Sequence, residues 1–259
     1  MGGTWGTVTC TAAAARGQLR TLQWLRAGNP LLQWLRVRDP PCPWDVKTCE
    51  AAAREGHLDV LIWAREHGCP WNDSVCQYAA KEGCLEILRW IQEHHPPTTW
   101  NDALVCAAGG GHIETMVWLR PRGSWTYYTC PEAAYHGQLE ALQWLYTQDP
   151  PAPWCTYVCT CAAKNNHLEV LQWLRAQNPP CPWDYYLAME SAENGHLEVL
   201  RWAHEHGCPW NEYTCAAAAK GGHLHILQWL RVQGCPWNEW TRTWAAPEVL
   251  AWVNEHASW

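Results

Sequence analysis

The sequence contains no phenylalanine, although it has 22 tryptophans and 9 tyrosines among its 259 residues. Such a skew arises when one aromatic type fills one repeated niche, and it also arises in a GC-rich genome that avoids phenylalanine codons. No stretch approaches the roughly 20 apolar residues that a membrane-spanning helix requires. The N-terminus also lacks the charged and apolar regions of a signal peptide. We therefore expect no membrane insertion.

Charge is scarce as well. The formal net charge is -7 and only 17% of the residues are charged. This mildly acidic balance argues against nucleic-acid binding, which depends on neutralising phosphates. The 15 cysteines recur mainly at two positions of a repeated unit and form no short disulfide framework. We expect a reducing compartment, the cytoplasm or the nucleus, with organelle import still open.

Motifs of catalysis and metal binding are also lacking. The sequence has no glycine-rich phosphate loop, no Ser/His/Asp constellation and no paired carboxylates. Cysteines such as Cys42 and Cys49, or Cys208 and Cys215, stand seven residues apart, wider than the spacing of about two to four in zinc sites. Small buried filler explains them better. We expect no enzyme activity, no cofactor, no metal and no small-molecule substrate.

What the sequence does contain is one unit repeated along nearly the whole chain. The copy at 214–237 has a small-residue run, a Gly-His-Leu turn, an Ile-Leu-x-Trp core and a closing Cys-Pro-Trp. The closing tryptophan recurs from Trp44 to Trp237 at spacings of 25 to 29 residues, and a second tryptophan recurs inside each unit. These spacings predict about nine units.

Each unit is expected to be a helix–turn–helix. The first helix is rich in alanine, the best helix former. The second has an apolar stripe, as in Leu58, Val60, Leu61 and Trp63, with polar residues between. Cys-Pro or Pro-Pro then stops it. We expect first helices to be capped by Thr48, Thr129 and Thr214 and ended by Gly56, Gly83, Gly137 and Gly222.

Two residue types recur at fixed places in the unit. The inner tryptophans, such as Trp173, are expected to form the core between repeats, with the indole N–H donating to a loop carbonyl. The turn histidines keep no fixed carboxylate or ligand partner, so we expect a structural hydrogen bond from them. They are His57, His112, His167, His196 and His223.

The motif Ala-Ala-x-x-Gly-His-Leu-x-Val-Leu, at 52–61 and again at 162–171, resembles the centre of the ankyrin repeat. The resemblance covers residue 4 to about residue 256 and implies an all-α solenoid that binds other proteins. Two departures stand out. Thr-Cys replaces the family's Thr-Pro-Leu-His, and the unit has about 27 residues rather than about 33. A short-repeat variant with tight Pro-Trp loops, lacking the long β-hairpin, is therefore expected.

The ends are irregular, as terminal units of a solenoid tend to be. We expect a single domain over 1–259. It comprises an irregular N-terminal unit at 1–43, regular repeats at 44–237 and a shortened C-terminal cap at 238–259. A ten-residue tandem duplication at 22–41 contains Pro30, which is expected to break the chain and leave an extra short helix. No Gly-His turn stands between Ala246 and Pro247, so the last helices should be short.

One position varies between units and is therefore available to a partner. Three residues after the closing tryptophan, the N-terminal half has small or polar residues such as Lys47 and Ser74. The C-terminal half has aromatic residues, which we expect in the loop before the first helix. Tyr127 and Tyr185 add to this set, whose other members are Tyr128, Tyr157, Tyr186, Tyr213 and Trp240.

These observations favour a non-enzymatic scaffold that binds another protein through the concave, loop-side surface of the stack. The seven aromatic residues are the candidate contacts, because Tyr and Trp are enriched at binding hot spots. Packing of these rings on neighbouring loops remains an alternative. A structural subunit held permanently in a larger assembly is an alternative function. An enzyme whose site lies in side chains that vary between units is a more distant one.

Overall fold

The structure is a computed structural model that describes residues 6–27 and 42–256. Over these residues every regular element is an α-helix. The chain divides into two compact units, residues 1–124 and 125–259, which are described separately. The expectation of a single domain over 1–259 stays a prediction. The segment around Pro30 lies outside the described residues.

Both units are built from helix pairs. In each pair a first helix leads through a tight turn into a second helix, and a loop then leads to the next pair. The pairs of the first unit are α1 (Thr7–Ala15) with α2 (Leu19–Ala27), α4 (Val46–Arg54) with α5 (Leu58–Glu66), α6 (Ser74–Lys81) with α7 (Leu85–His94), and α8 (Asn101–Gly110) with α9 (Ile113–Leu119).

The second unit continues the same pattern with five pairs. The predicted all-α fold of about nine helix–turn–helix repeats is therefore confirmed for the described residues. The pairs are α10 (Thr129–Tyr135) with α11 (Leu139–Tyr146), α12 (Thr156–Lys164) with α13 (Leu168–Ala176), α14 (Tyr185–Glu193) with α15 (Leu197–Glu205), α16 (Glu212–Lys220) with α17 (Leu224–Val232), and α18 (Glu239–Thr243) with α19 (Pro247–His256).

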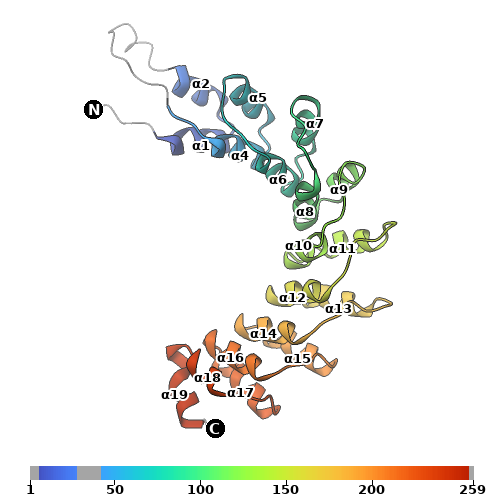
Figure 1. The fold of residues 1–259 in the computed structure, drawn as a ribbon. Coiled ribbons are helices and arrows are strands. Elements are labelled where there is room, and N and C mark those ends of the chain that lie inside the picture. Colours follow the sequence, from blue (N-terminus) through green and yellow to red (C-terminus); the bar gives the residue numbers. More distant parts are fainter. Residues whose placement is uncertain (1–5, 28–41, 257–259) are drawn as a thin grey trace, which may run out of the picture. The chain divides into compact units, whose positions relative to one another are not determined.

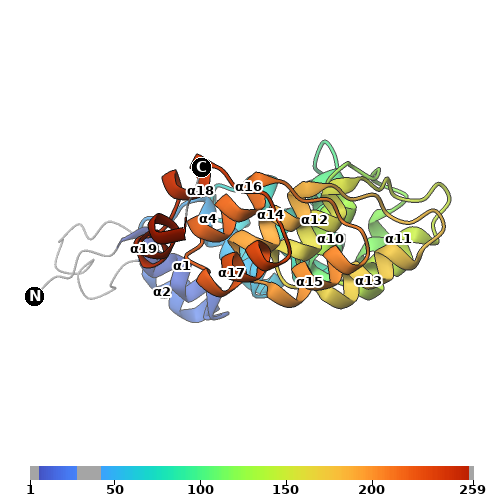
Figure 2. The same cartoon turned by 90° about the horizontal axis from the view of Figure 1, so that it is seen from below.

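First helices of successive pairs pack directly on one another. In the second unit α10 contacts α12, α12 contacts α14, and α14 contacts α16. Figures 1 and 2 show these first helices as one layer and α11, α13, α15 and α17 as the other. Small buried side chains, such as the run Cys215–Ala219 of α16, line the contact. The distance between two packed helix axes depends on the size of the side chains between them, so alanine permits close stacking.

In every pair except the last, α18 with α19, a residue in the left-handed region makes the turn. The predicted glycines Gly56, Gly83, Gly137 and Gly222 all have φ between 71° and 77°. Such a backbone carries little penalty only for glycine. The prediction that glycine ends the first helix is confirmed.

A hydrogen bond from the turn histidine links a pair of helices to the pair before it. His167 Nε2 donates to the Tyr135 carbonyl at 3.1 Å. Its ring also lies against Gly137, where a Cβ would be 2.6 Å from it. His196 and His223 make the same hydrogen bond to Lys164 and Glu193 at 2.9 and 3.0 Å. The predicted structural role is confirmed for these three histidines.

The caps of the first helices differ from expectation. Asp45, rather than Thr48, caps α4, with its side chain accepting from Lys47 N. Asn211 caps α16, and Thr214 sits three residues later, where its hydroxyl accepts from Asn211 N at 3.4 Å. The threonines were the wrong candidates because α4 and α16 begin two residues before Thr48 and Thr214, and α10 begins at Thr129 itself. They are buried inside the first turn.

The tryptophans lie at the edge of the core. The core itself consists of Ala, Leu, Val, Ile and Cys side chains, with Trp100 as its one tryptophan among the described residues. The inner Trp173 is half-buried and meets Trp154 edge to face, with centroids 5.7 Å apart. Trp24 is 49% exposed. The prediction that inner indoles form the core is wrong, because these rings stay partly exposed and pack against the core from its edge, as Trp229 and Trp252 do.

An arginine at the end of the second helix holds the following loop. Arg175 Nη1 donates to the Cys181 carbonyl at 2.6 Å, and its guanidinium lies 3.9 Å from the Trp183 ring centroid. Trp183 also meets Trp202 of the next pair at 6.0 Å. We call this contact the arginine clasp, and it recurs at Arg26, Arg65 and Arg231.

The last pair departs from the pattern in one helix only. Its first helix, α18, has 5 residues, whereas α19 has 10. Shortening was expected for both. Pro247 begins α19, and proline suits the first position of a helix because no partner is lost for its missing N–H. The second helix therefore keeps its full length.

Candidate functional site

A helix cap fixes the backbone position of one residue at the start of a first helix. The residue two positions after the cap donates its backbone N–H to the cap side chain, so its own side chain starts from a fixed point at the helix N-terminus. This bond joins Tyr186 to Asp184 at 3.0 Å, Tyr213 to Asn211 at 3.1 Å and Trp240 to Asn238 at 3.0 Å.

The seven candidate residues all belong to the second unit, and we call them the aromatic row. They are Tyr127, Tyr128, Tyr157, Tyr185, Tyr186, Tyr213 and Trp240. The most exposed is Tyr128, at 62%, and Trp240 is still 40% exposed. Tyr185 and Tyr213 are half-buried.

Most of the row lies in the first turn of a helix instead of the preceding loop. Tyr157, Tyr186, Tyr213 and Trp240 are each the second residue of their helix. The expected loop position holds only for Tyr127 and Tyr128, which precede α10. The helices begin early because an Asp or Asn caps α14, α16 and α18.

Some rings of the row pack on one another. Tyr185 stacks on Tyr186 at a centroid distance of 4.4 Å, and Tyr127 meets Tyr128 edge to face at 5.7 Å. Trp244 lies 5.7 Å from Trp240, although the sequence reasoning had missed it. Its position four residues after Trp240, on the same helix face, would have identified it.

Three of the equivalent positions of the first unit are polar, and the fourth is Val8, a small apolar residue that is 77% exposed. Lys47 and Asp102 are exposed, and their side chains carry charge. Ser74 donates its hydroxyl to Glu50 at 2.5 Å. The change from small or polar to aromatic side chains at one structural position therefore coincides with the second unit.

A pocket of about 180 Å³ opens within the row, between α10 and α12. Three tyrosines, Tyr128, Tyr135 and Tyr157, and the carboxylate of Glu132 line it, together with the buried Pro131 and Cys161. We call it the tyrosine pocket. Tyr135 was not predicted, although it stands two helical turns after Tyr128 on the same face.

The phenol of Tyr157 stays neutral near pH 7. The charge of Cys161 and a hydrogen bond with that thiol raise the pKa of Tyr157 to about 12. Burial raises the pKa of Cys161 to about 11. Glu132 is the one carboxylate side chain among the lining residues, and its Oε1 lies 3.2 Å from His136 Nε2.

The lysines on this face are paired with acids of neighbouring helices. Lys164 of α12 lies 3.1 Å from Glu190 of α14, and Lys220 of α16 lies 2.7 Å from Glu193 of α14. These exposed pairs are worth little individually to stability. They do neutralise the two lysines that the first helices present beside the aromatic row.

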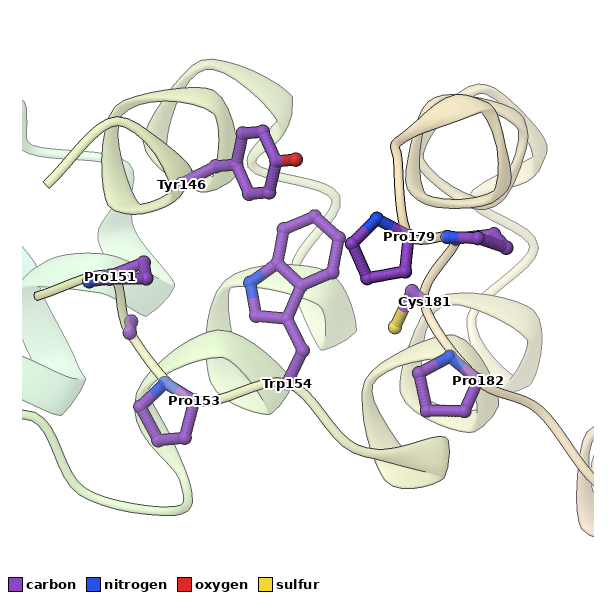
Figure 3. Close-up of a pocket in the computed structure, with 9 residues that line it drawn as sticks. Tyr146, Pro151, Pro153, Trp154, Pro179, Cys181 and Pro182 are labelled. Carbon is purple, nitrogen blue, oxygen red and sulfur yellow. The ribbon is translucent and has the colours of Figure 1, made fainter.

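A second pocket, of about 360 Å³, lies on the loops that follow α11 and α13. Prolines from both loops line it, and Figure 3 shows the Trp154 indole between Tyr146 and Pro179. Tyr146 stacks on Trp154 at 4.9 Å and donates its hydroxyl to the Asn178 carbonyl at 3.3 Å. Tyr146 thus stands at the end of its second helix, where other repeats have the clasp arginine. The pocket results from the packing of these two loops.

Among the residues that line the two pockets, the Glu, Asp, His and Cys side chains are Glu132, Cys161 and Cys181. Among the described residues, no three His, Cys, Asp or Glu side chains come together to hold a metal ion. All 15 cysteines are described, and none forms a disulfide. Burial raises the pKa of Cys76, Cys130 and Cys208 to about 12, so these thiols stay protonated. They act as small core residues.

The described residues thus define a helical repeat protein with an exposed aromatic face. In this part of the chain, no helix has both the length and the apolar character needed to cross a membrane. The family model for ankyrin repeats in many copies matches residues 130–175, which form α10 to α13. The same unit recurs in the described residues before and after this match. Residues 130–175 therefore match the ankyrin repeat, with a unit shorter than the family's usual one.

The comparison with solved structures returned another ankyrin-repeat domain at low similarity. The human ASB11 ankyrin repeat domain is 14% identical, with a TM-score of 0.48, over 82% of this chain and 99% of that chain. The comparison with curated proteins returned no match. The likeness to ankyrin repeats rests on the ankyrin model and the repeated unit.

Proposed function

We propose that the chain is a non-enzymatic scaffold that binds another protein along the aromatic row. Ankyrin repeats are generally protein–protein interaction modules, and their fold is typically non-enzymatic. The surface and the partner are specific to this proposal. No nucleic acid and no small-molecule substrate is part of it.

The observation that carries the proposal is the exposure of aromatic rings at positions whose backbone is already fixed. Tyr128, Tyr157 and Tyr186 are 62%, 46% and 48% exposed, yet each begins at the N-terminus of a packed helix. Aromatic rings placed in this way offer large contact areas, and tyrosine and tryptophan dominate binding hot spots. Little conformational entropy is lost when rigid rings are covered.

The test combines Tyr157→Ser with Tyr186→Ser. Both side chains are about half exposed, so we expect the melting temperature to change by no more than a few degrees. Capture of partner proteins from native extract, measured by quantitative mass spectrometry, should fall about tenfold or more, because two hot-spot rings are lost.

Two matched controls accompany this variant. Val232→Ser removes an 81% exposed apolar side chain from the end of α17, in the other helix layer. Replacing Lys47 and Ser74 by alanine changes the same structural position in the first unit. Neither should alter capture. Unchanged capture by the tyrosine variant, or unfolding of the repeats that contain it, would show that the row is packing and not a binding surface.

The rival hypothesis, a subunit held permanently in a larger assembly, predicts a different result. The isolated chain would then associate with itself or precipitate. A monomer by size-exclusion chromatography, with row-dependent capture of a partner, supports the scaffold.

A further inference from the structure

The tyrosine pocket differs from the rest of the aromatic row in its chemistry. Here three tyrosine rings and a carboxylate line a cavity of about 180 Å³. The face of an aromatic ring is negative and attracts cations. A carboxylate beside such rings adds a full negative charge, so this combination suits a cation more than a neutral apolar group.

Glu132 retains acceptor capacity within the pocket. Its Oε1 contacts His136 Nε2 at 3.2 Å, on the same helix and one turn away. A carboxylate has two oxygens and about four lone-pair sites, so this single contact leaves room for further donors. The nearest lysine of α12, Lys164, is bound to Glu190 at 3.1 Å and does not fill the pocket.

The charge of the chain is also unevenly distributed. Residues 1–124 contain twelve Lys and Arg and twelve Asp and Glu, whereas residues 125–259 contain six and thirteen. The whole formal net charge of -7 therefore belongs to the second unit, which carries the pocket. An acidic unit attracts basic partners over distances of about a Debye length, and it repels acidic ones.

The protein uses the same chemistry internally. Arg54 lies over the Tyr78 ring at 4.2 Å, and Arg175 lies over Trp183 at 3.9 Å. Guanidinium groups on aromatic faces are thus a recurring contact in this fold. The tyrosine pocket has the aromatic half of that contact without a cation of its own among its lining residues.

We propose that the tyrosine pocket binds a positively charged side chain, arginine or lysine, from a basic segment of the partner protein. The cation lies between the rings of Tyr128, Tyr135 and Tyr157 and is paired with Glu132. This inference rests on the proposed function, because it makes the pocket one anchor point of the row. It adds the chemical class of the partner, a basic peptide segment.

The test uses three fluorescein-labelled peptides on the full chain. Each contains four Gly-Ser-X units, where X is arginine, lysine or citrulline, the neutral analogue of arginine. Binding is measured by fluorescence anisotropy at low and at physiological salt. We expect the arginine and lysine peptides to bind at least about tenfold more tightly than the citrulline peptide, with the difference shrinking as salt rises.

Variants of the pocket then locate the bound cation. Glu132→Gln should weaken arginine-peptide binding about three- to tenfold and leave the citrulline peptide unchanged. Tyr157→Leu should weaken it similarly, whereas Tyr157→Phe, which keeps the ring, should not. The control is Glu140→Gln, since Glu140 is an exposed carboxylate on α11 outside the pocket. Circular dichroism checks that each variant is folded.

Three results would overturn the inference. They are an absence of saturable arginine-peptide binding up to about 1 mM, equal binding of the arginine and citrulline peptides, or equal losses for Glu132→Gln and Glu140→Gln. The proposed function is judged separately, by partner capture with the variant of Tyr157 and Tyr186. If capture depends on these rings while the peptides do not differ, the scaffold stands and only the cation site fails.

Discussion

Removal of one clasp arginine should destabilise the second unit measurably. We consider Arg175→Met, because methionine keeps an apolar stem of similar reach and deletes the guanidinium group. A hydrogen bond from a charged donor contributes about 1.5–3 kcal/mol, and a guanidinium on a ring adds about 0.5–1 kcal/mol where solvent has access. Arg175 is half-buried, and both contacts share one group. We therefore expect less than their sum, about 2 kcal/mol.

The effect should appear in two measurements. A loss of about 2 kcal/mol lowers the melting temperature of a domain of this size by about 4–8 °C. The loop at 177–183 should also exchange its amide hydrogens faster, since the Cys181 carbonyl and the Trp183 ring lose their common partner. Denaturation followed by circular dichroism gives the first, and hydrogen exchange with mass spectrometry gives the second.

The control is Arg201→Met. Arg201 is exposed on α15, and its guanidinium lies 5.7 Å from the Trp229 ring, farther than in any clasp. Its loss should change stability by no more than about 0.5 kcal/mol. Equal melting shifts for Arg175→Met and Arg201→Met would refute the view that the clasp stabilises the loop.

Two further pairs of variants test the packing. Trp173→Ala removes a half-buried ring and should cost about 2–3 kcal/mol of stability, below the 3–5 kcal/mol typical of full burial. Trp24→Ala removes a 49% exposed ring and should cost under about 1 kcal/mol. Equal melting shifts for the two variants would contradict the structure. Gly137→Ala places a Cβ 2.6 Å from the His167 ring at a residue with φ 72°, and should lower stability by about 3 kcal/mol. Gly207→Ala, where φ is 82° and no atom lies within 4 Å of the added Cβ, should lower it by about 1 kcal/mol. Indistinguishable urea midpoints for the two glycine variants would mean that the histidine moves aside freely.

The repeat period predicted the fold well because the residues that recur have strong effects on local backbone conformation. Glycine at the turn, alanine in the first helix and proline after the second each restrict the backbone directly. Gly137 and His167 could therefore be assigned their roles from recurrence alone. The same period located the aromatic row, since one position per unit differs between the two halves.

How deeply each side chain is buried could not be predicted from the repeat period. Recurrence shows that Trp173 occupies the same place as its counterparts, but it does not show how closely adjacent first helices approach. In the structure Trp173 is half-buried at the edge of a core made mainly of Ala, Leu, Val, Ile and Cys side chains. The caps were missed for a related reason, since Asp184 and Asn211 lie where the pattern suggested loop.

The tyrosine pocket was also beyond the reach of sequence reasoning. Tyr128 and Tyr157 are 29 residues apart, and their meeting depends on the angle between α10 and α12. Tyr135 joins them only because the helix turns twice between Tyr128 and Tyr135. A periodic pattern gives the residues of each unit, whereas the space between units follows from packing geometry.

The cap bond has a consequence for how this surface can change. The cap contacts only the backbone N–H of the residue that follows it by two, and so it is indifferent to the side chain there. Lys47 on Asp45, Tyr186 on Asp184 and Trp240 on Asn238 already show three different side chains on one such bond, each at 3.0 Å. Each repeat therefore offers one interchangeable position, and a new specificity can evolve by single substitutions that leave the scaffold unaltered.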